Sequence, residues 1–177
     1  KVTQRLLPAP PRLTTDQLRA TPISPMTIVY LSIDPANRQP LFAAGVHTRL
    51  IALLVDPQAT PGAKESAAGA LGNLAVDAAN LQPLFAAGVH TRLMALLVDP
   101  QATPGAKESA AGALGNLAVD AANRQPLVAA GVHTRLMALL DDPQATHGAK
   151  EHAAGALRNL SIAAANLQPL VAAGVHT

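Results

Sequence analysis

A near-identical repeat of 43 residues constrains this chain more than any other feature. The segment LFAAGVHTRL begins at Leu41 and at Leu84, and close variants begin at Leu127 and Leu170, so every offset is 43 residues. The block that starts at Leu41 differs from the next block at only two positions. A period in the low forties is typical of helical solenoids and of four-stranded propeller blades.

Composition decides between these two architectures. Alanine, the best helix former, is abundant, whereas aromatic residues make up only 2% of the chain. Strands favour aromatic and β-branched residues in alternation, and the sequence lacks that pattern. We therefore expect an all-α protein whose helices pack through many small apolar contacts.

Each unit is predicted to contain three helices, and the first two are short. Asn37 is a candidate N-cap for the first helix, with Pro40 inside its first turn. Gly45 is placed to end that helix as the residue after its C-cap. The second helix is expected from His47 to Val55, because the following Asp-Pro pair disfavours the α conformation.

The third helix is the longest in each unit. Thr60 is its candidate N-cap and Pro61 its first residue, and the helix is expected to run from Ala63 to about Val76. The same elements recur 43 and 86 residues later. One such unit cannot bury its apolar surface alone, so we expect the units to stack around a continuous core.

The chain divides on this basis into a proline-rich N-terminal extension or cap and a repeat array. Residues 1–25 form the extension or cap, and the array occupies 26–177. The predicted units are a remnant repeat, three full repeats and a partial repeat, at 26–36, 37–79, 80–122, 123–165 and 166–177. Ser24 and Pro25 look like the cap and first residue of a remnant third helix.

The order of these motifs resembles the armadillo repeat. The glycine turn AAGV, the leucine-rich second helix, the DP break and the AAGALxNLA third helix follow in the family's order over residues 26–177. HEAT repeats are the near alternative, but they usually lack the short first helix that ends at glycine. The segment AAGALRNLS at 153–161 is similar to plant-type and vacuolar armadillo proteins and to β-catenin. The resemblance implies a right-handed α-solenoid.

The resemblance also implies a binding surface on the concave face, which third helices line. In the family, one asparagine per repeat bonds the backbone of an extended ligand, and the matching residues here are Asn73, Asn116 and Asn159. Independently of the family, a side-chain amide offers two donors and an acceptor oxygen to a peptide backbone. Glu65, Glu108 and Glu151 lie eight residues before these asparagines on the same helical face and would make the groove mildly acidic. Alternatively, these glutamates complement the helix dipole.

The sequence departs from the importin type at one position of the predicted groove. Importin-type armadillo proteins place a tryptophan one turn before the asparagine, where this chain has Gly69, Gly112 and Gly155. Without an aromatic wall, importin-type binding of nuclear localisation signals is not expected. The glycines reflect close packing or chance, or else they form a flat floor that admits a bulky partner helix.

The third full repeat carries larger polar residues near the predicted groove. Ser66 and Ser109 correspond to His152, Gly115 corresponds to Arg158, and Pro104 corresponds to His147. We include Ser66, Ser109, His152 and Arg158 among the candidate protein-binding residues, although neutral drift explains the changes equally well.

Several functional classes are disfavoured by the sequence. The formal net charge is only +2 and the repeat array is nearly neutral, so nucleic-acid binding is not expected. Histidines recur at 47, 90, 133 and 176, but copies about 10 Å apart could not share one zinc ion, whose ligands lie about 2.1 Å away. The chain has no cysteine, no phosphate-binding loop and no nucleophile elbow. No transmembrane helix is predicted. We expect neither a cofactor, a metal nor an enzymatic activity.

The sequence leaves three functional hypotheses open. The first is a protein–protein interaction module that binds an extended peptide or a partner helix along the groove. The second is a structural spacer or consensus-like scaffold without a dedicated ligand, which the near identity of the repeats favours. The third is a substrate-recruiting arm of a larger protein such as a ubiquitin ligase. We expect the chain in the cytoplasm, with the nucleus as the alternative.

The C-terminal end of the array also raises an expectation. The repeat pattern breaks off soon after a first helix, so an apolar edge would be exposed. We expect a fragment of a longer array, with a naturally short C-terminal cap as the alternative. The exposed ends predict end-to-end association.

Overall fold

The computed structural model describes residues 10–20 and 23–175, and every regular element within them is helical. The first helices of the three full units are α3 (Pro35–Ala43), α6 (Ala78–Ala86) and α9 (Ala121–Ala129). The second helices are α4 (Val46–Val55), α7 (Val89–Val98) and α10 (Val132–Asp141). The third helices are α5 (Pro61–Leu74), α8 (Pro104–Leu117) and α11 (His147–Ser161). At the ends lie α1 (Thr15–Ala20), α2 (Pro25–Ile33), the 3-10 turn η1 (Ala164–Asn166) and α12 (Leu167–Ala172).

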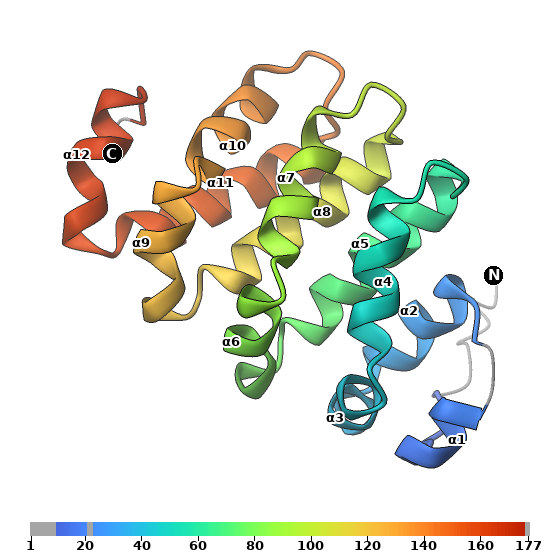
Figure 1. Cartoon of the computed structure of the whole chain (residues 1–177). Helices are drawn as coiled ribbons and strands as arrows, with labels where there is room; N and C mark the ends of the chain where they lie inside the picture. Colours follow the sequence, from blue (N-terminus) through green and yellow to red (C-terminus); the bar gives the residue numbers. More distant parts are fainter. Residues whose placement is uncertain (1–9, 21–22, 176–177) are drawn as a thin grey trace, which may run out of the picture.

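The helices stack into two rows that run along the molecule. Figure 1 shows α4, α7 and α10 side by side in one layer, with α5, α8 and α11 in a second layer behind it. Each third helix packs against the third helix of the next unit, and α2 packs against α5 at the start of this row. The predicted all-α solenoid is therefore confirmed.

Threonine and glycine set the helix ends as the sequence predicts. The hydroxyls of Thr60, Thr103 and Thr146 each accept a bond from the backbone N–H three residues later. Gly45 has a φ of 75°, which lets the chain turn sharply from α3 into α4 without steric cost. The third helix begins at Pro61 and ends at Leu74, two residues before the predicted end.

The predicted start of the first helix is wrong. The helix α3 begins at Pro35, and its N-cap is Asp34, whose carboxylate accepts a bond from the N–H of Ala36. Asn37 therefore lies inside the helix and is only 1% exposed. Pro40 lies beyond the first turn, inside the helix. Asp and Asn are both favourable N-caps, and Asp34, which comes before Asn37 in the chain, is the one that caps α3.

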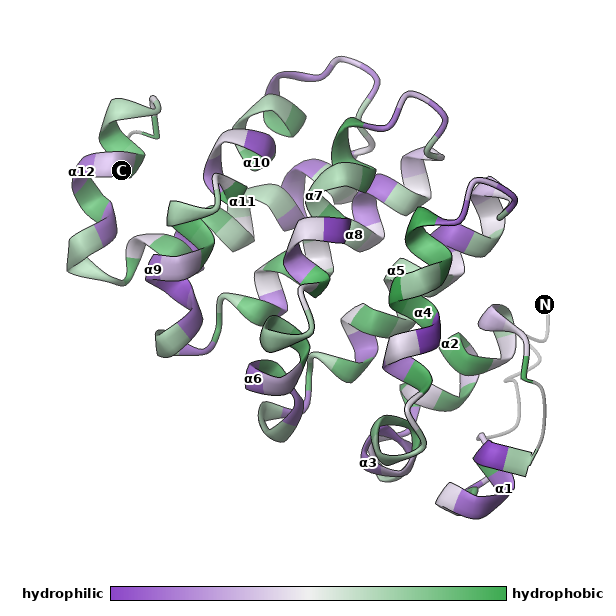
Figure 2. Cartoon of the chain, viewed as in Figure 1, coloured by the Kyte–Doolittle hydropathy of each residue, from purple (hydrophilic) through white to green (hydrophobic). Residues whose placement is uncertain are grey.

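Small side chains allow close packing between third helices. Ala67, Ala70, Ala110 and Ala113 are almost completely buried where α5 meets α8. A Cβ atom at Gly72 would lie 3.5 Å from that of Ala113, so the two helices approach closely here. Figure 2 shows polar residues concentrated on the loops that join second to third helices.

The described part of the N-terminal extension lies against the first unit. Leu18 of α1 is buried, and the Arg19 guanidinium donates to the carbonyl oxygen of Ala43 at 3.0 Å. The amide of Asn37 donates to the carbonyl oxygen of Pro11 at 2.9 Å. Residues 1–9 and 21–22 of the predicted extension, and His176 with Thr177 at the other end, lie outside the described residues.

Among the described residues, none of the helices has both the length and the apolar character needed to cross a bilayer. The pair α6 and α7 reaches that length and composition only when taken together, and it is bent by 77°.

Candidate functional site

The predicted asparagines occupy equivalent places on the third-helix row. Asn73, Asn116 and Asn159 lie one or two residues before the ends of α5, α8 and α11, and each is half-buried. A half-buried amide keeps some polar atoms accessible while its stem is packed against neighbouring helices. This placement is compatible with the predicted contact to a bound peptide.

Each asparagine also ties its helix to the preceding one. The amide nitrogen of Asn116 donates to the carbonyl oxygen of Gly72 at 3.0 Å, and that of Asn159 donates to Gly115 at 3.1 Å. The amide of Asn73 donates to the hydroxyl of Ser32 on α2 at 3.0 Å. The amide nitrogen of each asparagine is therefore engaged within the solenoid. The Oδ1 atoms have no partner among the described residues and remain available to a ligand.

A hollow of about 210 Å³ lies between the third helices, and we call it the third-helix groove. Its lining includes Gly69 and Asn73 of α5, Glu108, Ser109 and Asn116 of α8, and His152 of α11. The structure thus brings together candidates from three units.

The three glycines predicted to line the groove, Gly69, Gly112 and Gly155, differ in their surroundings. A Cβ atom at Gly69 would meet the Ser109 hydroxyl at 3.7 Å, and one at Gly112 would meet the His152 ring at 3.6 Å. Nothing lies within 4 Å of a Cβ at Gly155. All three sites therefore have room for a methyl group, and close packing does not require glycine at any of them.

The predicted glutamates make contacts between units. The carboxylate of Glu65 accepts from the Thr103 hydroxyl at 2.5 Å, and that of Glu108 accepts from Thr146 at 2.6 Å. Thr103 and Thr146 are the N-caps of α8 and α11, so each carboxylate lies against the positive end of the next third helix. The sequence suggested that each glutamate complements the dipole of its own helix. In the structure, Glu65 and Glu108 lie against the N-terminus of the next third helix instead. Glu151 instead pairs with His147 at 3.1 Å, and both side chains are largely exposed.

The remaining candidates differ in exposure along the row. Ser66 is only 7% exposed, where α2 packs against α5. The equivalent residues in the next two units are more accessible: Ser109 is half-buried and His152 is exposed. Arg158 is exposed as well. His152 therefore reaches the groove, whereas Ser66 is poorly placed to touch a ligand.

Sequence reasoning missed a second set of asparagines and the glutamines that bind them. Asn80 and Asn123 are at most 1% exposed, and their amides donate to the carbonyl oxygens of Leu74 and Leu117. Gln39 donates to the Oδ1 of Asn80 at 3.0 Å, and Gln82 donates to that of Asn123 at 2.8 Å. The spacing of 41 residues between each glutamine and its asparagine was the available signal.

His47, His90 and His133 lie in the first turn of the second helices. The His47 and His90 rings stack on Phe42 and Phe85, with centroids 3.9 Å and 4.4 Å apart. Burial lowers the pKa of His47, His90 and His133, partly opposed by a backbone carbonyl at each site. Within residues 10–20 and 23–175, no three His, Asp or Glu side chains are grouped to hold a metal ion.

The similarity of this chain to known proteins is found among solved structures. No family model and no curated protein matches the sequence. Among solved structures, a designed armadillo repeat protein in complex with the peptide (KR)4 is 27% identical, with a TM-score of 0.74 over 90% of this chain. A structure of computationally designed armadillo repeat proteins for modular peptide recognition is 28% identical, also with a TM-score of 0.74 over 90% of this chain.

The chain has the fold of armadillo-repeat proteins. A further designed armadillo repeat protein matches with a TM-score of 0.76 at 26% identity, over 90% of this chain and 69% of that one. This armadillo array spans 63% of the length of each of the first two solved chains, which is less than two thirds.

Proposed function

We propose that this armadillo array is a non-enzymatic scaffold that binds an extended peptide with basic side chains along the third-helix groove. The observation that carries the proposal is the row of half-buried asparagines at Asn73, Asn116 and Asn159, whose Oδ1 atoms have no partner among the described residues. Such acceptors can receive backbone N–H groups from a ligand without reading its side chains.

The spacing of the row supports an extended ligand. Packed helices lie about 10 Å apart, and an extended peptide rises about 3.3 Å per residue. Each asparagine would therefore meet roughly every third residue of the peptide. The low floor at Gly69 and Gly112 leaves room for the peptide backbone to approach.

Charge supports a basic ligand. The Glu108 carboxylate lines the groove, and Glu65 occupies the equivalent place one unit earlier. Each carboxylate has only one oxygen engaged by threonine, which leaves the other oxygen to meet a cation. A solved neighbour of the same fold was determined with the basic peptide (KR)4, which makes that peptide the natural probe.

The test is a fluorescence-anisotropy titration of labelled (KR)4 with the whole chain and two variants. Ser109→Trp places an indole in the groove, whereas Ala52→Trp adds the same group to the exposed side of α4. We expect Ser109→Trp to weaken binding by about tenfold or more and Ala52→Trp to leave it unchanged. Circular dichroism and urea unfolding of each variant separate blocked binding from unfolding.

Two results would contradict the proposal. If (KR)4 does not bind the unmodified chain at low salt, the groove lacks its proposed ligand. That result would favour the hypothesis that the array is a structural spacer. If both tryptophan variants bind (KR)4 as the unmodified chain does, the peptide binds elsewhere.

A further inference from the structure

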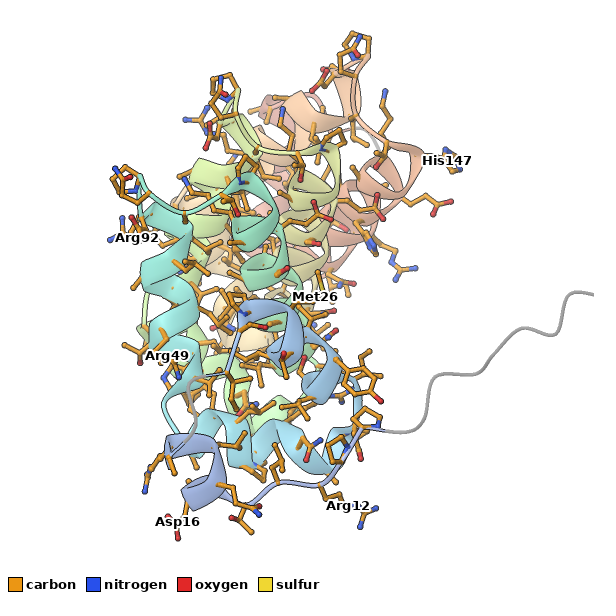
Figure 3. The ribbon with its side chains drawn as sticks, turned by 90° about the vertical axis from the view of Figure 1, so that its right-hand side faces the viewer. Arg12, Asp16, Met26, Arg49, Arg92 and His147 are labelled. Atoms are coloured by element: carbon orange, nitrogen blue, oxygen red, sulfur yellow. The ribbon has the colours of Figure 1, made fainter. Side chains whose placement is uncertain are left out.

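The second-helix face, formed by α4, α7 and α10, carries a row of unpaired arginines. Arg49, Arg92 and Arg135 occupy the same position in these helices, and all three are exposed. Within the described part of the chain, none of their guanidinium groups has a hydrogen bond or an ion pair. Figure 3 shows Arg49 and Arg92 on one side of the molecule, pointing outward, with His147 on the opposite side.

Other arginines of the chain are used to bind helix ends. Arg38 donates to the carbonyl oxygens of Ser32 and Ile33, and Arg124 donates to those of Ala118 and Val119. The arginines of the second-helix face therefore differ from these structural arginines, since their guanidinium groups make no hydrogen bond or ion pair within the described residues.

Acidic groups offset the arginines only at one edge of this face. The three second helices contain a single carboxylate, Asp141 at the end of α10. The aspartates that follow the helices, Asp56, Asp99 and Asp142, each accept a backbone N–H two residues later. The Asp142 carboxylate also pairs with Lys107 at 3.7 Å. The middle of the face is therefore positive.

A furrow of about 530 Å³ runs beside the last arginine, between α7 and α10. Met94, Ala95 and Val98 of α7 form its apolar side, while Thr134 and Arg135 of α10 lie across from them. Val98 is 48% exposed, which is high for a large apolar side chain. The furrow thus offers an apolar contact directly beside a free cation, and a partner that uses both must be amphipathic.

We propose that the second-helix face binds an acidic amphipathic helix of a partner protein, which lies across α4, α7 and α10. Packed helices are about 10 Å apart, and an α-helix advances about 10.5 Å in seven residues. Carboxylates at every seventh position of the partner would therefore meet Arg49, Arg92 and Arg135 in turn. An apolar residue midway between two of those carboxylates enters the furrow between α7 and α10. This surface is separate from the third-helix groove, and the two proposals stand independently.

The test is a titration of a synthetic acidic helix with glutamate at every seventh position and leucine midway between. Its binding to the whole chain is compared with that of a peptide of equal composition in scrambled order. Combined Arg49→Glu, Arg92→Glu and Arg135→Glu is expected to reduce affinity for the ordered peptide by about tenfold or more at low salt. The control variant combines Arg12→Glu, Lys64→Glu and Lys150→Glu, which changes net charge equally and should reduce affinity far less.

A second variant tests the furrow without touching an arginine. Ala95→Glu places a carboxylate on the exposed side of α7, opposite Arg135, and should weaken binding of the ordered peptide. All substituted side chains are exposed or half-buried, so the variants should unfold at the same urea concentration as the unmodified chain.

Three outcomes would overturn the proposal. The ordered and scrambled peptides could bind equally, which would show that only charge matters. The control variant could lose as much affinity as the arginine variant. An oligothymidylate of equal charge could bind the same face more tightly than the ordered peptide, which would assign the arginines to nucleic acid.

Discussion

The first helices of the central units and that of the C-terminal unit begin differently, although their sequences are almost the same. The helices α6 and α9 begin after Asp77 and Asp120, whose carboxylates accept backbone N–H bonds as N-caps. The equivalent residue in the last unit is Ala163, which has no side-chain acceptor. There the chain forms the 3-10 turn η1, and α12 starts only at Leu167.

The alanine at position 163, which stands where the earlier units have an aspartate, also removes a contact between units. Gln39 and Gln82 each bridge the aspartate and the buried asparagine of the following unit. Gln125 makes neither bond, and the Oδ1 atom of Asn166 is buried without a partner. One aspartate thus caps its own helix and also positions the glutamine that satisfies a buried acceptor.

The N-terminal end solves the same problem in another way. Among the described residues no glutamine contacts Asn37; instead its Oδ1 accepts the backbone N–H of Leu13 at 3.2 Å. The N-terminal segment therefore satisfies an acceptor that the last unit leaves unpaired. This comparison predicts that equivalent substitutions will have unequal effects along the array.

The largest effect is expected at the buried asparagines. Asn123→Ala removes the donor to Leu117 and the acceptor of Gln82, and we expect a loss of about 3 kcal/mol. Asn166→Ala removes the donor to Leu160 but also an unpaired oxygen, so its expected loss is about 1 kcal/mol. Urea unfolding followed by circular dichroism measures both. Equal losses would contradict the proposed difference between the units.

The next effect concerns the aspartate itself. Ala163→Asp should restore the cap and the contact to Gln125, stabilising the last unit by about 1 kcal/mol. Asp120→Ala should cost a similar amount, and it serves as the reciprocal variant. Amide hydrogen exchange at 164–167 is expected to slow in Ala163→Asp. Unchanged exchange there would show that the cap alone does not determine the 3-10 turn.

A smaller effect is expected at the glycines of the third helices. Gly155→Ala adds a methyl group with no atom within 4 Å, so it should stabilise α11 by up to about 1 kcal/mol. Gly131→Ala is the contrasting variant, because Gly131 has a φ of 83° and an alanine there is strained. Its melting temperature should fall while that of Gly155→Ala rises. A rise in both would refute the assignment of strain to the turn.

The smallest effect is expected from pH, because the titrating groups are partly or largely exposed. Burial lowers the pKa of His47, His90 and His133, so the unfolded chain binds protons more readily and stability should fall as the pH drops below about 6.5. Bonds from Gln82 and Ala122 lower the pKa of Asp120, whose contribution is lost at still lower pH. Unfolding midpoints measured across this range check the prediction. His47→Gln, His90→Gln and His133→Gln combined should flatten the upper part of the curve.

Local chemistry made much of the fold predictable. Thr60 with Pro61, and the glycine at 45, specify helix ends through interactions within a few residues. The start of the first helix was predicted wrongly because Asp34 and Asn37 are both good caps, and only burial distinguishes them. The contacts of Glu65 and Asn116 to neighbouring units, and the free arginines of the second-helix face, depend on how units stack, which a single repeat does not reveal.

The most direct test of the account compares its two sets of asparagines during peptide binding. Side-chain amide NMR signals of Asn73, Asn116 and Asn159 would be followed during titration with (KR)4, alongside those of the buried Asn80 and Asn123. We predict that the three groove amides shift with a common affinity while the buried amides stay in place. Shifts confined to the buried set or to the second-helix face, or no shifts at all, would contradict peptide binding in the third-helix groove.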